Sequence, residues 1–111
     1  MKKLTPSQTK KYDINQKIIH ELTNLESRLV LFSITKQART GAEISSKIKV
    51  PLSTVYQKLH SLEELSLIFV ERIDGSESAA KNAKHYRSRI KGVDILISKQ
   101  EPKLILIKNK F

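Results

Sequence analysis

Residues 40–68 read TGAEISSKIKVPLSTVYQKLHSLEELSLI, a stretch with two apolar patterns separated by a short polar break. In the first pattern Ile44 and Ile48 lie on one face of a helix, which predicts a short helix from about 42 to 48. Pro51 separates this helix from the next, because a proline displaces the preceding residue from the α region. Two helices joined by so short a break predict a helix-turn-helix.

The second pattern predicts a helix over 53–66, capped by a Ser or Thr at its start. Apolar residues recur along it at helical spacing and would pack on a core, while polar residues between them would face outward. Its acids, Glu63 and Glu64, lie at the C-terminal end, so the N-terminal half can approach an anion. Because the DNA major groove admits one α-helix, this helix is the candidate for contacting bases. Its buried stripe is Val55, Leu59 and Leu62, and its outward residues are Ser53, Thr54, Gln57, Lys58 and Ser61.

A helical apolar pattern also runs upstream, from residue 14 to about 37. We interpret it as two helices rather than one, because Thr23 and Asn24 cap helices better than they propagate them. Gly41 suits the left-handed position that ends this segment. Residues 1–12 are polar and rich in lysine, and they predict a basic, flexible N-terminal arm.

Downstream of the helices the apolar pattern alternates, which predicts strands. At 85–91 the alternation places one histidine and three bases on one face of a strand, the expected wing, and Gly92 predicts a bend or bulge. The fold class is therefore mainly α with a β wing (α+β), a winged helix-turn-helix. We expect a single domain over 13–111, with its core at 24–91 and additional C-terminal strands within 92–109. The expected strands cover 67–73, 85–91, 93–98 and 104–108.

The basic charge is concentrated in part of the chain. Its 111 residues include 21 Lys and Arg against 11 Asp and Glu, a formal net charge of +10. The stretch 24–74 is nearly neutral, whereas 78–93 holds five bases and no acid. Such a run favours an anion-binding stripe over an ordinary solvated surface, where the signs are mixed. We therefore expect a basic wing over 81–91 that meets the phosphate backbone or the minor groove of double-stranded DNA.

The helix-turn-helix at 40–68, with the helix beginning LESRLVL at 25–31, resembles the ArsR-type and related winged-helix transcription regulators of archaea and bacteria. The chain departs from their pattern at Ser66, where glycine is usual. The resemblance covers about 24–91 and implies a DNA-binding repressor or activator that acts as a homodimer on a pseudo-palindromic site. ArsR-type metal sensing does not carry over, since the chain has no cysteine, and we expect no metal and no cofactor. The resemblance implies major-groove contacts from Ser53, Thr54, Tyr56, Gln57, Lys58 and Ser61, and wing contacts from Lys81, Lys84, His85, Arg87 and Arg89.

Several classes of protein are excluded by what the sequence lacks. No apolar run approaches the roughly 20 residues of a membrane span, and the N-terminus lacks the apolar stretch of a signal peptide. We therefore expect a cytoplasmic, nucleoid-associated protein. The acids are scattered and no glycine-rich phosphate loop is present, so we do not expect an enzyme.

Two alternative functions remain open at this stage. The high proportion of lysine among the bases suits a non-specific architectural, chromatin-like DNA-binding protein, because lysine contacts phosphate as a point charge. A protein-interaction winged helix, with its basic stripe on an acidic partner, is the other. The C-terminal strands are apolar on both faces, and this favours a homodimer in which a second copy covers them.

Overall fold

The computed structural model describes residues 6–75, 83–98, 100 and 102–111. Within these residues, helices come first and strands follow, as expected for a winged helix-turn-helix of the α+β class. The elements are α1 (Pro6–Leu22), α2 (Leu25–Ser33), α3 (Gly41–Ile48), α4 (Leu52–Glu64), β1 (Ile68–Asp74), β2 (Ala83–Ser88), β3 (Ile90–Leu96) and β4 (Lys103–Lys108).

The upstream helical pattern forms two helices, α1 and α2, as interpreted. Asn24 is the N-cap of α2, and its side-chain oxygen accepts a hydrogen bond of 2.9 Å from the Ser27 amide. The expected flexible arm over 1–12 is corrected at residues 6–12, which belong to α1. Pro6 starts the helix, because the first helical residue needs no intrahelical partner for its amide. Residues 1–5 lie outside the described part of the chain.

The prediction for Gly41 was wrong: it is the first residue of α3, and no described glycine has a positive φ. The sequence contains a capping box that explains this start. The Glu43 amide donates to Thr40 Oγ1 at 3.1 Å, and the Thr40 amide donates to Glu43 Oε1 at 2.9 Å.

The predicted Ser or Thr cap of α4 was also wrong. Its N-cap is Pro51, which makes no side-chain capping bond. At the other end, Ser66 has a φ of 60°, its amide donates to the Glu63 carbonyl at 2.9 Å, and the Leu67 amide donates to the Leu62 carbonyl at 3.0 Å. This pair of bonds is a Schellman motif, so Ser66 occupies the left-handed position that usually holds glycine.

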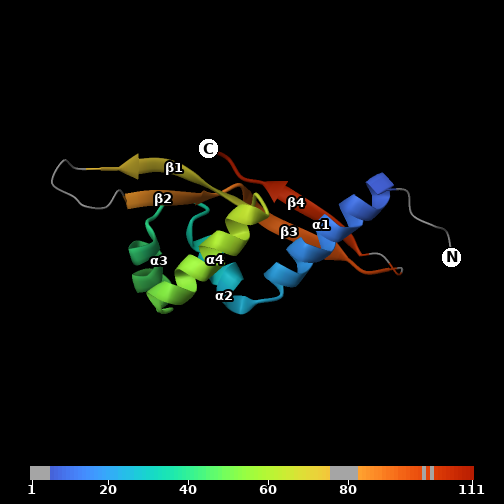
Figure 1. Ribbon diagram of the computed structural model, residues 1–111, viewed down its shortest axis with the longest axis horizontal. Coiled ribbons are helices and arrows are strands. Elements are labelled where there is room, and N and C mark those ends of the chain that lie inside the picture. The colour runs from blue at the N-terminus through green and yellow to red at the C-terminus, as the bar shows by residue number, and fades with distance from the viewer. Residues whose placement is uncertain (1–5, 76–82, 99, 101) are drawn as a thin grey trace.

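Strands β1 and β2 form an antiparallel hairpin, which we call the wing, and β3 and β4 form a second one. A register shift between Ile90 and Gly92 confirms the bulge expected at Gly92. The segment between α2 and α3 also pairs with β2, because Arg39 and Tyr86 exchange backbone hydrogen bonds of 3.0 and 2.8 Å. The hairpins extend from the helices in opposite directions, the wing beside α3 and the second hairpin beside α1 (Figure 1).

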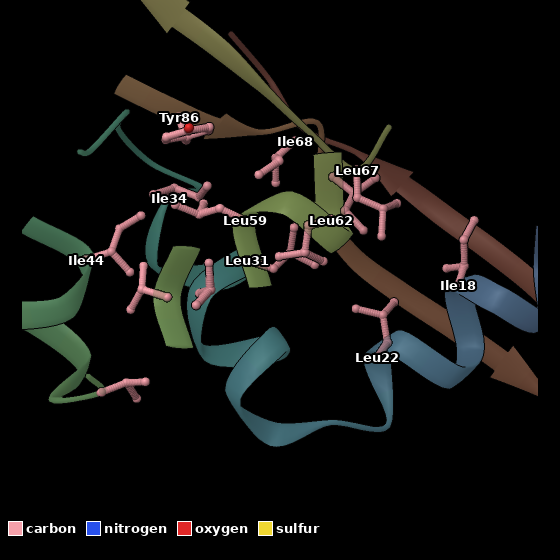
Figure 2. Close-up of a cluster of buried hydrophobic side chains, with 14 residues drawn as sticks. Ile18, Leu22, Leu31, Ile34, Ile44, Leu59, Leu62, Leu67, Ile68 and Tyr86 are labelled. Atoms are coloured by element: carbon pink, nitrogen blue, oxygen red, sulfur yellow. The ribbon is translucent and has the colours of Figure 1, made fainter. Parts of the chain in front are cut away.

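One hydrophobic core joins the helices to both hairpins. Side chains of α2, α3 and α4 meet the inner face of the wing, and α1 extends the core along the second hairpin through Ile18 and Leu22 (Figure 2). The radius of gyration is 16.2 Å, against about 13 Å for a compact domain of similar length. The molecule is therefore elongated, with the two hairpins extending from opposite sides of the core (Figure 1).

Candidate nucleic-acid interface

Helix α4 carries the predicted division into a buried and an outward face. Its stripe of Val55, Leu59 and Leu62 is at most 1 % exposed. On the outward face Ser53, Tyr56 and Gln57 are exposed, whereas Thr54, Lys58 and Ser61 are half-buried. The Ser61 hydroxyl donates to the Gln57 carbonyl at 3.1 Å, so it already has one hydrogen-bond partner within the helix.

Tyr56 lies over the first residue of α3. A Cβ on Gly41 would stand 2.8 Å from Cζ of the Tyr56 ring, so only glycine leaves room for the ring in this position. The ring is nevertheless half-exposed, at 50 % of its accessible surface. Tyr56 therefore packs on α3 with one side and borders the outward face of α4 with the other.

The capping box holds α3 beside this face and alters the acidity of its glutamate. The hydrogen bond from the Thr40 amide, followed by that of the Thr40 hydroxyl, lowers the pKa of Glu43 below its ordinary value. Ser45 Oγ donates to the Val50 carbonyl at 2.6 Å and closes the turn between α3 and α4. Under the wing, burial raises the pKa of the Tyr86 phenol.

The five residues expected on the wing separate into three groups. Lys84 is exposed in β2, toward the end of the wing. Lys81 lies outside the described residues. His85, Arg87 and Arg89 have other surroundings, described next.

His85 is not a surface group, which corrects its expected role as a phosphate contact. It is 7 % exposed, and its Nε2 lies 2.7 Å from Oδ2 of Asp74 in β1. Its Nδ1 lies 3.9 Å from Oε1 of Glu43 and makes no hydrogen bond with the described residues. The imidazole therefore pairs with Asp74 inside the wing and lies beside the capping box of α3.

Arg87 is engaged in contacts within the protein at the base of the wing. Its side chain is 16 % exposed, and Nη1 donates to Oε1 of Glu71 at 3.0 Å. Its guanidinium also lies 5.5 Å from the centre of the Phe111 ring. Burial on the opposite side of β2 fixes the direction of these contacts, because Tyr86 and Ser88 face the core and Arg87 faces away from it.

Arg89 is exposed but lies at the same outer face. Its guanidinium stacks 4.8 Å from the centre of the Phe69 ring, and Phe69 is opposite Arg87 in the strand register. The Phe69 ring in turn meets Phe111 edge to face at 5.1 Å. Arg87 and Arg89 are thus directed away from α4 rather than toward the groove that α4 would enter.

Sequence reasoning missed the residue that holds this region together, Asn109. It is 7 % exposed, and its side-chain amide donates to the Thr35 carbonyl at 2.8 Å and to the Ser88 carbonyl at 2.9 Å. Its own backbone amide donates to the Arg89 carbonyl at 2.9 Å. The sequence contains one sign of this role: Asn109 is the single amide residue in the stretch 103–110, which otherwise consists of lysines and aliphatic residues.

The described residues contain no group of three or more histidine, aspartate or glutamate side chains that could hold a metal ion. Among the helices in this part of the chain, none is long and apolar enough to cross a membrane.

Comparison with known proteins supports the fold. Among protein-family models and curated protein sequences, none matches this chain. Among solved structures, NolR from Sinorhizobium fredii is similar with a TM-score of 0.62 and 22 % identity, over 79 % of this chain and 81 % of NolR. The homodimeric winged helix-turn-helix DNA-binding domain Mb0332 (fragment 1–100) of Mycobacterium bovis, a possible ArsR-family transcriptional regulator, is similar with a TM-score of 0.60 and 16 % identity. That likeness covers 83 % of this chain and 77 % of the other. At these identities the likeness establishes the winged helix-turn-helix fold.

Proposed function

We propose that this chain is a sequence-specific DNA-binding transcription regulator. The observation that carries the proposal is the outward face of α4, which is uncharged at most positions, exposed toward its N-terminal half and backed by a fully buried stripe. A helix of this kind fits the major groove, where short polar side chains reach base edges. The two similar structures, one of them a DNA-binding domain, support the same use of the fold.

Base contacts would come from α4 and phosphate contacts from the wing. Gln57 is the principal candidate for base reading, because its amide can bond an adenine in two places. We assign phosphate contacts to Lys84 of the wing and to Lys81, in place of the buried His85 and of Arg87, which is paired with Glu71. The other major-groove candidates are Ser53, Thr54, Tyr56, Lys58 and Ser61.

We further propose that the regulator is a homodimer. The face of the second hairpin that packs on the core near Ile18 continues beyond the core through Ile95 and Leu106, which are 42 % and 41 % exposed. Ile14 of α1 lies one helical turn before the buried Ile18, on the same face of the helix, and is 45 % exposed. A second copy would cover this surface, and a two-fold symmetric pair suits a pseudo-palindromic site. Changing both Ile95 and Leu106 to Asp should give a folded monomer in light scattering, and a dimer that persists would contradict this surface.

This function requires no catalysis, and it fits a cytoplasmic protein at the nucleoid. The proposed DNA contacts lie on α4 and the wing, and they require neither a metal nor another cofactor.

The experiment that tests the proposal selects bound duplexes from a random library and then measures affinity for the enriched and random sequences at matched salt. A regulator enriches a motif and binds it at least a hundredfold more tightly than random DNA, consistent with specific binding in general. Gln57→Ala should reduce this preference, while Lys84→Ala should weaken all sequences equally.

Other outcomes would decide for the alternatives. Tight, steeply salt-dependent binding without an enriched motif would make the chain an architectural DNA-binding protein. If no duplex binds at physiological salt, neither DNA-binding function holds, and the chain is a winged helix that binds another protein.

A further inference from the structure

We propose that Gly41, the first residue of α3, is a positioning residue for DNA binding. Gly41 acts through Tyr56 of α4: because Gly41 has no side chain, the Tyr56 ring can lie on α3 and leave the outward face of α4 open. The proposal rests on the proposed function, since it requires that this face of α4 meets DNA. It adds a residue outside α4 that sets how tightly DNA is bound.

The backbone of α3 gives no reason for a glycine at this position. No described glycine has a positive φ, so Gly41 does not use the left-handed conformation that favours this residue type. The capping box is formed by Thr40 and Glu43, and neither of its two hydrogen bonds involves Gly41. Because glycine is less favourable than alanine in a helix, its presence here requires another explanation.

The packing of the Tyr56 ring supplies this explanation. A Cβ on Gly41 would lie 2.8 Å from Cζ, 2.9 Å from Cε1 and 3.0 Å from the hydroxyl oxygen of Tyr56. Non-bonded carbon atoms prefer separations of about 3.5–4.0 Å, so a side chain at residue 41 and the ring cannot both keep these positions. All three atoms belong to the far end of a side chain that is 50 % exposed, so the ring would move and α3 would stay.

Helix α3, which lies beside α4 (Figure 1), is fixed before its start, in its middle and after its end. Just before the helix, Arg39 and Tyr86 exchange backbone hydrogen bonds of 3.0 and 2.8 Å. Within the helix, Ile44 is fully buried in the core. In the turn that follows, Ser45 Oγ donates to the Val50 carbonyl at 2.6 Å. Helix α3 therefore offers the ring a fixed surface.

A Tyr56 ring that left α3 would move toward the outward face of α4. The opposite side of this helix is filled by its buried stripe, which is at most 1 % exposed. On the outward side, Ser53 lies three residues before Tyr56 and Gln57 directly follows it, and both are exposed. Residues three apart are neighbours on a helix, and a helical side chain covers the turn before its own Cα. The displaced ring would therefore cover Ser53 and restrict the access of DNA to this face.

The experiment is a double-mutant cycle with the full chain. The wild type, Gly41→Ala, Tyr56→Ala and the double variant are compared at one salt concentration for their affinity for a labelled duplex taken from the bound pool of the random library. Gly41→Ala in the Tyr56→Ala background is the matched control, because it makes the same change in α3 where no ring can be displaced. Urea unfolding of all four proteins shows whether each is folded.

Gly41→Ala should lower the affinity about fivefold or more when Tyr56 is present, and less than about twofold when it is absent, while the protein stays folded. An equal loss in both backgrounds would overturn the proposal, because Gly41 would then act independently of Tyr56. Unchanged affinity of Gly41→Ala would overturn it too, as would a Gly41→Ala protein that does not fold, since the ring and not α3 is expected to move. Each of these results leaves the proposed function standing, which fails only if the wild type binds no duplex.

Discussion

Helix α4 and the wing were both predicted from side-chain spacing, yet the two predictions differ in outcome. On α4, every residue predicted to be buried is buried, and the outward residues are exposed or half-buried. On β2, Lys84 is exposed as expected, but His85 is buried against Asp74 and Arg87 is covered at the base of the wing.

The two predictions differ in outcome because other segments cover a surface helix and a strand pair in different ways. A surface helix packs one stripe on the core, so its own period decides which residues face solvent. A strand pair has two faces, and its outer face is exposed only if no other segment lies on it. Here the segment 109–111 crosses the outer face of the wing base, where Phe111 meets both Phe69 and Arg87. Alternation within β2 contains no information about a segment some twenty residues away.

The substitution that we expect to have the largest effect on stability is Asn109→Ala. The substitution removes two hydrogen bonds, to the Thr35 and Ser88 carbonyls, from a mostly buried site, so we expect a loss of about 2–3 kcal/mol in the free energy of unfolding. Gln57→Ala on the open face of α4 is the control and should change stability by less than about 0.5 kcal/mol. Urea unfolding measures both. Equal effects would mean that the wing base does not depend on the C-terminal segment.

A second test separates the two cations of β2. Arg87→Met should destabilise the protein by about 1–2 kcal/mol, because it breaks charge-assisted bonds in a mostly covered site, including that to Glu71. Lys84→Met should leave stability unchanged but lower the slope of log affinity for DNA against log salt by about 1. Thermal unfolding and salt-titrated DNA binding give the two readouts. If Arg87→Met lowers the slope and Lys84→Met does not, our assignment of phosphate contacts is reversed.

Local sequence patterns sufficed for the order of the elements, the two N-terminal helices, the helix-turn-helix and the bulge at Gly92. These patterns gave wrong predictions where one residue type is compatible with two kinds of local structure. Pro6 was interpreted as part of an arm, although proline also starts helices, and Gly41 was interpreted as a helix end, although it makes room for Tyr56. His85 and Asn109 act through partners distant in the sequence, and only the folded chain brings these together.

The end of α4 offers a test with a smaller expected effect, because Ser66 there has a backbone conformation that a side chain does not favour. Ser66 adopts a φ of 60°, where a side chain costs about 1 kcal/mol relative to glycine. Ser66→Gly should therefore raise the free energy of unfolding by up to about 1 kcal/mol, reduced by the greater freedom of glycine in the unfolded chain. DNA affinity should be unchanged, since the residue lies beyond the outward face of α4. A destabilised variant would show that Ser66 contributes contacts that offset its strain.

We expect the smallest effect on stability from a substitution in the capping box of α3, which lies beside His85 of the wing. Hydrogen bonds from Thr40 lower the pKa of Glu43 in the folded protein, so its carboxylate stabilises the fold above the unfolded pKa near 4.3 and this contribution is lost as the pH falls. Glu43→Gln keeps an oxygen for the Thr40 amide but cannot titrate. Because Glu43 is largely exposed, the variant should lose only a few tenths of a kcal/mol at pH 7, and the difference should disappear below about pH 4. Urea unfolding of both proteins from pH 7 to pH 3 measures it. A difference that stays constant across this range would mean that the carboxylate charge does not stabilise α3.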